Sequence, residues 1–420
     1  MAAPAPPLRS WTDLPGDVLY EVLRRVQCGA DRGCAALACR PWRDALGRDA
    51  DPPAPLPWLL LPSRSAAGGR LRACCVLSGG GAHGHPNLDV APPGPRCFGS
   101  HDGAWLFRDL RRDGGTYQLL NVRTGHVYAL PSEFEPFSDG LRAHEDMVLL
   151  AATLSAPPGQ LGCVAAGIIY WPGIPSPEVQ NVALRRVVLW RMGMGAQVVA
   201  QDFSLEPVEQ ALDVEDIIYH RGAFQVLTKG EDILAYRPLL HQQGSIGASV
   251  NLRCFLPRGR RNDDVVHSRY LVVSGEELLM VVRFSSRPPS RTREFRVFRV
   301  VEPPKPAANN DNADTDDDDD DDPNPAAAAP TWSELNTLGG RVLFVGRGCS
   351  RAYEANQYEG LEEGVYFLDD SSFYDIELIA GANARTYACV DNGKWSERGV
   401  ESCFPSQEAS DYSPPAWLLP

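Results

Sequence analysis

Short apolar segments that flank glycines recur along most of the chain, and this recurrence limits the folds open to it. The segments span four to seven residues, and the glycines concerned are Gly103, Gly167, Gly222, Gly275 and Gly340. The first four are separated by 64, 55 and 53 residues. Long amphipathic helices are absent from this region, and 38 glycines with 36 prolines suit a turn-rich β fold.

A period of this length is typical of a β-propeller, in which each repeat is one blade of antiparallel strands. Returning strands follow the glycine segments at residues 233–236 and 295–298. About 320 residues at roughly 45 to 55 per blade give six or seven blades. We therefore expect an all-β domain over residues 67–420, a six- or seven-bladed β-propeller, with a pair of β-sandwiches as the alternative.

The first fifty residues follow a helical period instead. Apolar side chains share one helical stripe at Leu14, Val18, Leu19, Val22, Leu23 and Val26. A break over residues 27–33 and Pro41 then predict two further short helices, with Trp42 and Leu46 on one face. Three helices this short leave apolar surface uncovered, which indicates a partner.

This segment resembles an F-box, and the match runs from Leu14 to about Leu46. The residues that carry it are Leu14, Pro15, Val18, Leu19, Val22, Leu23, Cys39, Trp42 and Arg43. The resemblance implies an F-box over residues 10–50 that docks a Skp-type adaptor, and through it cullin, in an SCF-type ubiquitin ligase. The candidate adaptor-binding or F-box core residues are then Leu14, Pro15, Val18, Leu19, Val22, Leu23 and Trp42.

One stretch of the segment departs from the F-box pattern. Family members usually have a more apolar, leucine-rich stretch where this chain has Asp31, Arg32 and Gly33. The alternative to an F-box is an ordinary three-helix cap packed on the next domain. A proline-rich linker is expected to follow at residues 51–66, because prolines keep a chain extended.

The remainder resembles a plant F-box family whose C-terminal region is the KIB-type β-propeller, formerly a domain of unknown function. The similar strings are RCFGSHDGAWL from Arg96, LLNVRTG from Leu119, YLVVSGEELLMV from Tyr270, VYFLDD from Val365 and PPAWLLP from Pro414. Val122 stands where the family usually has proline. The resemblance implies that the propeller presents an unknown target protein while the F-box holds the ligase.

The formal net charge of −14 is mostly local. Nine aspartates lie between Asp311 and Asp322, so the rest of the chain carries only −14 + 9 = −5. We expect a disordered acidic insert at about residues 302–330, because like charges repel and little there could be buried. It has no glycine bend and no closing glutamate, which argues against a calcium loop. The mildly acidic body offers no footprint for nucleic acid or an anionic membrane.

Other sequence features bear on location and bound groups. The chain has no apolar run long enough to span a bilayer and no secretory signal at its start, so we expect a cytoplasmic or nuclear protein. The eleven cysteines are scattered without a Cys-x-x-Cys pair, which favours reduced thiols over a zinc site. We expect no cofactor and no bound metal.

Catalytic motifs are weak. The string from Gly79 to His85 lacks the ending of a phosphate loop, and a third ligand beside His83 and His85 is not visible. A propeller glycosidase would need two carboxylates, with candidates at Asp102, Asp213, Glu215, Asp216, Glu276 and Asp369. We therefore expect a non-catalytic substrate receptor, with a non-ligase interaction scaffold or a propeller enzyme such as a glycosidase as alternatives.

Overall fold

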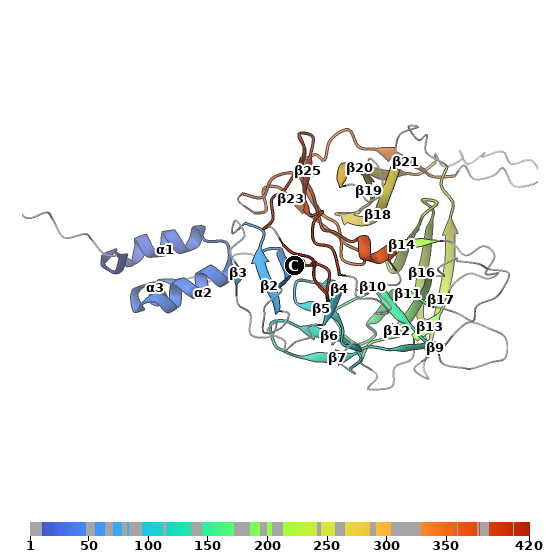
Figure 1. The fold of residues 1–420 in the computed structure, drawn as a ribbon, viewed down its shortest axis with the longest axis horizontal. Coiled ribbons are helices and arrows are strands. Elements are labelled where there is room, and N and C mark those ends of the chain that lie inside the picture. Colours follow the sequence, from blue (N-terminus) through green and yellow to red (C-terminus); the bar gives the residue numbers. More distant parts are fainter. Residues whose placement is uncertain are drawn as a thin grey trace, which may run out of the picture.

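A ring of six β-sheets forms the larger part of the molecule, with three helices projecting from its side (Figure 1). The sheets are the blades of a six-bladed β-propeller, which confirms the predicted fold and fixes the blade number. The computed structural model describes residues 11–47, 55–63, 70–77, 82–83, 95–111, 115–135, 145–171, 185–193, 200–203, 213–241, 245–256, 265–285, 291–303, 329–358, 360–375, 378, 386–405 and 407–420.

The first three blades are given from the inner strand outwards. Blade one contains β27 (Ala416–Leu418), β1 (Trp58–Ser63), β2 (Arg70–Cys75) and β3 (Ala82–His83). Blade two contains β4 (Arg96–His101), β5 (Trp105–Asp109), β6 (Tyr117–Asn121) and β7 (Val127–Ala129). Blade three contains β10 (Val148–Leu154), β11 (Val164–Tyr170), β12 (Arg185–Arg191), β13 (Ala200–Asp202), β8 (Glu133–Glu135) and β9 (Glu145–Asp146).

The remaining blades follow the same order. Blade four contains β14 (Val214–His220), β15 (Ala223–Thr228), β16 (Ile233–Leu240) and β17 (Ile246–Arg253). Blade five contains β18 (Val265–Ser274), β19 (Glu277–Ser285), β20 (Thr292–Val301) and β21 (Thr331–Glu334). Blade six contains β23 (Arg351–Glu354), β22 (Arg341–Phe344), β24 (Gly364–Phe367), β25 (Gly393–Ser396) and β26 (Gly399–Glu401), with β22 and β24 parallel.

Apolar packing between neighbouring blades holds the ring together. Within the described part of the chain, each of the six blade interfaces has its own cluster of buried apolar side chains. Between blades five and six, for example, the ring centroids of Phe295 and Phe367 lie 5.0 Å apart. Strands such as β10 are buried on both faces, so they read as continuous apolar runs instead of an alternating pattern.

The two ends of the propeller meet in blade one. Strand β1 pairs antiparallel with β27, with Trp58 opposite Leu418 and Leu60 opposite Ala416. Between them on β27, Trp417 donates its indole N–H to the Val345 carbonyl oxygen of blade six at 2.9 Å. The ring is therefore closed by a strand taken from the C-terminal end of the chain.

Two predictions need correction, one about a domain boundary and one about the recurring glycines. The predicted linker over residues 51–66 contains strand β1, and Leu56 before it is buried, so the propeller begins ahead of residue 67. The apolar run from Trp58 to Leu61 at the start of β1 is the physical reason, because it is long enough for a strand. Among the recurring glycines, Gly103, Gly222 and Gly275 occupy tight turns after inner strands, whereas Gly167 lies inside β11.

The helices precede the ring. They are α1 (Gly16–Arg25), α2 (Gly29–Ala38) and α3 (Arg40–Leu46), with a 3-10 turn at Trp11–Asp13. Pro41 lies in the first turn of α3, as its missing N–H allows. The break predicted over residues 27–33 is shorter, because α2 already begins at Gly29. None of the described helices is long or apolar enough to cross a membrane.

Replacing Trp417 with alanine should destabilise the ring strongly. The side chain is 1% exposed, and its loss would leave a cavity and an unpaired Val345 carbonyl group at the closure. We expect the free energy of unfolding to fall by about 3–5 kcal/mol. Urea unfolding followed by far-UV circular dichroism measures it. Leu161→Ala, at a side chain 92% exposed, is the control and should change it by less than about 0.5 kcal/mol; equal effects would contradict the role of closure.

Candidate functional site

The helical segment (Trp11–Gly47) contains its own small core. Leu19 and Leu23 of α1 are fully buried against Ala45 of α3, and Leu14 and Trp42 pack against this core at half-buried positions. Leu19 and Leu23 are therefore internal to the segment. They hold the three helices together and are not available to a partner.

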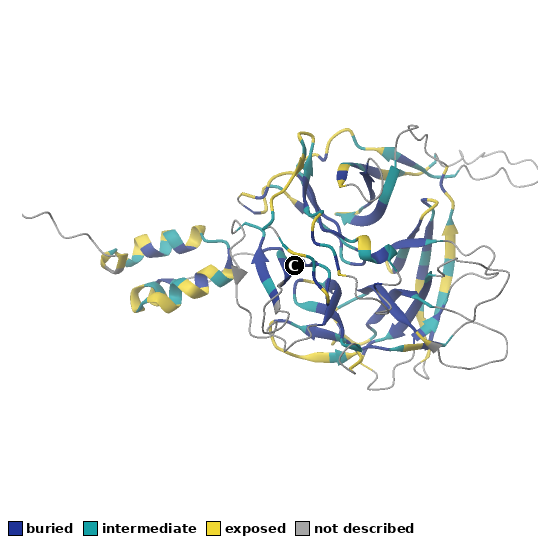
Figure 2. Ribbon diagram, in the orientation of Figure 1, coloured by how far each residue is buried: buried dark blue, intermediate teal, exposed yellow. Residues whose placement is uncertain are grey.

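The other predicted residues of α1 face outwards. Val18 is 44% exposed, Pro15 is exposed and Val22 is half-buried. Their spacing of three and four residues places them on a second stripe, beside the buried one. In Figure 2 exposed residues alternate with less exposed ones along the helices, in contrast to the buried strands of the ring.

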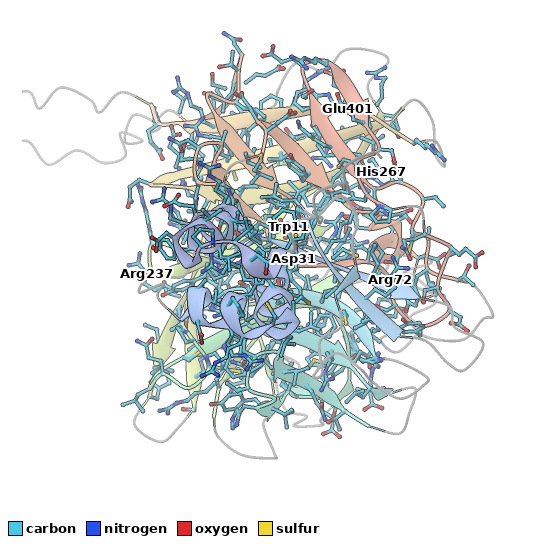
Figure 3. All side chains as sticks on the ribbon, turned by 90° about the vertical axis from the view of Figure 1, so that its left-hand side faces the viewer. Trp11, Asp31, Arg72, Arg237, His267 and Glu401 are labelled. Carbon is cyan, nitrogen blue, oxygen red and sulfur yellow. The ribbon has the colours of Figure 1, made fainter. Side chains whose placement is uncertain are left out.

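Two further apolar side chains of the helical segment are exposed although they were not among the predicted residues. Leu37 of α2 is 78% exposed, and Trp11 is 67% exposed with its ring centroid 6.5 Å from that of Trp42. Figure 3 shows Trp11 on the helices in front of the propeller. We call Trp11, Pro15, Val18, Val22 and Leu37 the exposed apolar residues of the helical segment. The sequence signal for Leu37 was its place in the apolar run of residues 34–39.

Arg32 has a structural role at the point where the sequence departs from the F-box pattern. Its side chain is buried, and its Nη1 donates to the Leu23 carbonyl oxygen at 2.7 Å. The same carbonyl accepts the backbone N–H of Val26 at 3.0 Å, so the guanidinium is a second donor at the end of α1. The charged residue thus joins α2 to the end of α1.

The helical segment is attached to the ring where blades six and one meet. Cys28, just ahead of α2, is buried in the same apolar cluster as Leu56, Cys75 and Tyr358. A hydrogen bond to the Cys75 thiol, together with burial, raises the pKa of the Cys28 thiol well above its usual value. Tyr358 donates its hydroxyl hydrogen to the Pro55 carbonyl oxygen at 2.9 Å. The burial of Cys28 therefore places the helices against one sector of the propeller, and the Tyr358 hydrogen bond holds the start of the propeller chain at the same place.

Buried charges link the blades near the axis. Arg347 of blade six donates to the Glu215 carbonyl oxygen of blade four, and forms an ion pair with Asp370 at 3.3 Å. Arg283 of blade five donates to both Asp370 (3.2 Å) and Asp391 (2.7 Å). Burial opposes the ionised form of Asp370, but the two arginines hold its pKa below the usual range. The groups neutralise one another, which makes this a structural network.

Asp216 is the other buried link between blades. Its carboxylate accepts hydrogen bonds from the backbone N–H groups of Ile217 (2.8 Å), Gly348 (2.8 Å) and Leu271 (2.7 Å), in blades four, six and five respectively. Burial raises its pKa to about 7, and the N–H donors and Arg347 oppose that rise. With both oxygens occupied by backbone donors, this carboxyl group has a fixed structural task.

A cavity of about 310 Å³ lies where the inner strands β4, β10 and β14 end. Its polar lining includes the imidazole of His101, the guanidinium of Arg351 and several hydroxyl groups, those of Ser100, Thr153, Ser155, Tyr219 and Ser350. A second cavity of about 80 Å³ lies against Arg347 and Asp370. The larger of these two cavities combines hydroxyl groups with apolar walls, among them Leu154, Ile218 and Val273.

The carboxylates considered for glycoside hydrolysis do not converge on one cavity. Asp102 and Glu276 belong to turns, Asp213 pairs with Arg185 at 2.8 Å, and Glu215 lies 3.5 Å from the Arg269 guanidinium. The remaining two are the buried Asp216 and Asp369, which accepts from Ser371 Oγ at 2.8 Å. Each group is held by its own neighbours, an arrangement that does not resemble a general acid with a nearby base.

Metal binding is a separate question from glycoside hydrolysis. Among the described residues, no group of three His, Cys, Asp or Glu side chains is placed to hold a metal ion. His85 and the aspartates of residues 311–322 lie outside the described residues, and of His83 only the backbone, in β3, is described.

A family model described as KIB1-4 beta-propeller matches residues 83–391. The chain belongs to this family. The match begins at β3 and ends after β24, so most of the closing blade lies outside it. Membership of the KIB1-4 family favours a protein-interaction function. Neither the curated proteins nor the solved structures contain a significant match to the chain.

The protonation of His101 tests whether its side chain is buried in the larger cavity of this KIB1-4 propeller. Burial lowers the pKa of its imidazole to about 4. In the unfolded chain it would protonate near pH 6.5, so its contribution to stability should be lost as the pH falls from 6.5 towards 4. NMR titration, with His101→Gln to assign the signal, should show a midpoint near pH 4. A midpoint between pH 6 and 7 would contradict this burial.

Proposed function

We propose that the chain is a substrate-receptor subunit of an SCF-type E3 ubiquitin ligase. In this proposal the helical segment is an F-box that docks a Skp-type adaptor, and through it cullin, while the propeller binds a target protein. The observation that supports it most is the second apolar stripe of α1, where Val18 remains exposed beside a complete core. Membership of the KIB1-4 family adds a propeller suited to protein interaction.

Such a subunit would contribute no catalytic group. Its effect would come from holding the target near a ubiquitin-charged enzyme, because tethering raises the effective concentration of the reacting groups. The attachment of the helices through the buried Cys28 supports this, since a fixed joint limits the positions that the target can occupy. The protein would then act in the cytoplasm or nucleus, where the ligase and its targets meet.

The proteins that bind the helices decide between this proposal and a non-ligase scaffold. A ligase subunit should bring both adaptor and cullin through a native purification of the full chain. A scaffold whose helices only contact another protein would bring neither of them. Because both functions use the same propeller, recovery of a target protein alone does not separate them.

Val18→Asp should prevent adaptor binding without unfolding the helices. The side chain is exposed, so the folded chain tolerates a carboxylate, whereas an apolar interface does not. We expect the adaptor recovered by pull-down to fall at least about tenfold. Leu161→Asp, on the propeller, is the matched control and should leave recovery unchanged.

A second variant separates the two stripes of α1. Leu19→Asp puts a charge into the core of the helical segment, so it should lower recovery by unfolding the helices. Circular dichroism of each variant distinguishes this from loss of the surface alone. Full adaptor recovery with Val18→Asp, from a chain of unchanged helical content, would contradict the proposed interface.

A further inference from the structure

The outermost strand of blade four is much longer than the outermost strands of the other blades. In the described part of the chain, blades one, two, three, five and six have outermost strands of two to four residues. The outermost strand of blade four is β17, which contains eight residues, Ile246–Arg253. Short outer strands protect a sheet from pairing with other chains, so a long one leaves more of the sheet edge open.

Strand β17 also lacks the other features that usually protect an edge, which are bulges, prolines and charged side chains. Its pairing with β16 is continuous from Ile246 to Arg253, and none of its residues is proline. The sequence contains no Asp, Glu, Lys or Arg over residues 238–252. At the end of the strand, Arg253 is already paired with Glu302 at 2.7 Å. The edge of β17 is therefore regular and uncharged.

A hydrogen bond next to the strand shows which of its residues direct their backbone groups outwards. His241 donates its backbone N–H to the Ser245 carbonyl oxygen at 3.1 Å, so these two residues form a hydrogen-bonded pair. Along an antiparallel ladder such pairs alternate with pairs that do not bond to each other. The residues that direct N–H and C=O away from β16 therefore include Ala248, Val250 and Leu252. Pro238 agrees with this assignment, because it lies opposite Ala248 and has no N–H to donate.

These outward backbone groups lie at the surface and are unpaired. Leu252 is 39% exposed, and Ala248 and Val250 are half-buried because their side chains pack against the apolar cluster between blades three and four. No described residue accepts a backbone hydrogen bond from the N–H group of any of the three. In Figure 1 β17 lies on the outer rim of the ring, on the side away from the helices. Figure 2 shows the strand mostly in the colours of intermediate and exposed residues.

The side chains of β17 alternate between two kinds. The face towards blade three has the apolar residues Ile246, Ala248, Val250 and Leu252. The opposite face has the small or polar residues Gly247, Ser249 and Asn251. When two identical strands pair antiparallel about a two-fold axis perpendicular to the sheet, equivalent faces lie on the same side. The apolar residues of one strand would then lie beside the apolar residues of the other, so β17 is complementary to itself.

We propose that two copies of this chain associate through β17, by antiparallel pairing of their β17 strands across a two-fold axis. The outward N–H and C=O groups of Ala248 and Val250 bond to the same groups of the second copy, and the two sheets of blade four become one continuous sheet. The helical segment is attached where blades six and one meet, on the far side of the six-bladed ring. Association through β17 leaves it free, so the dimer does not depend on the ligase proposal.

Charge favours a second copy as the occupant of this edge. The chain has a formal net charge of −14, but nine of its aspartates lie within residues 311–322 and none of its charge lies within residues 238–252. Two β17 strands therefore meet without placing like charges opposite each other. The nearest charged side chain of β16 is Arg237, which lies one strand further from the seam, opposite Ser249. The edge thus selects a strand by its alternation of apolar and polar residues, which β17 itself has.

Analytical ultracentrifugation of the full-length chain measures the association. Pairing of one strand per copy forms a small interface, so we expect a dimer with a Kd in the micromolar range, seen as a rise in mean mass between about 1 and 200 µM. Hydrogen exchange locates the contact, because the β17 peptide should exchange more slowly at the higher concentration. A chain that stays monomeric overturns the proposal and leaves the edge to a strand of another protein. A dimer without added protection in β17 overturns it as well.

Two variants test the backbone contact. Ala248→Pro removes an outward N–H that β16 does not use, once in each copy, so the Kd of the dimer should rise at least about tenfold. Ala248→Ser keeps the N–H and is the matched control, with a Kd changed by less than about twofold. Equal Kd values for the two folded variants would overturn the proposal. If circular dichroism shows that Ala248→Pro unfolds, Leu252→Lys decides, since it puts a charge on the exposed edge and should weaken the dimer equally; an unchanged Kd would then overturn it.

Discussion

The pairing of β27 with β1 is the contact on which the rest of the molecule depends. It completes blade one, and only a complete ring gives every inner strand two neighbours. Trp417 lies at this seam, packed against Phe344 with ring centroids 5.0 Å apart. Tyr353 also stabilises this seam, because its hydroxyl donates to the Pro420 carbonyl oxygen at 2.7 Å. Gly103 packs closely against the same proline, since a Cβ at position 103 would lie 2.4 Å from Pro420 Cα. A side chain at Gly103 would push the chain end out of place.

The helical segment is attached to the ring where blades six and one meet. On its other side blade six is tied to blade five by the buried network of Arg283, Asp370 and Asp391. The blade beside the helices is therefore held from both of its neighbours.

The sequence was informative where one local period decides the structure. Recurring glycines predicted the blades, because turns with positive φ, as at Gly222 and Gly275, require that residue. The stripe on α1 predicted a helix, but period alone could not tell that Leu19 points inwards and Val18 outwards. The buried network around Asp370 could not be predicted at all. Arg283, Asp370 and Asp391 come from blades five and six, and they meet only in the folded ring.

The division of blade one between distant parts of the chain has a consequence for synthesis on the ribosome. The helices emerge first and contain their own core of Leu19, Leu23 and Ala45, so they can begin to fold while most of the propeller is still untranslated. Strand β27 is synthesised after all the other described strands of the ring, because it follows them along the chain. A nascent chain would thus carry its folded helical segment while five blades are made, before β27 could close the ring.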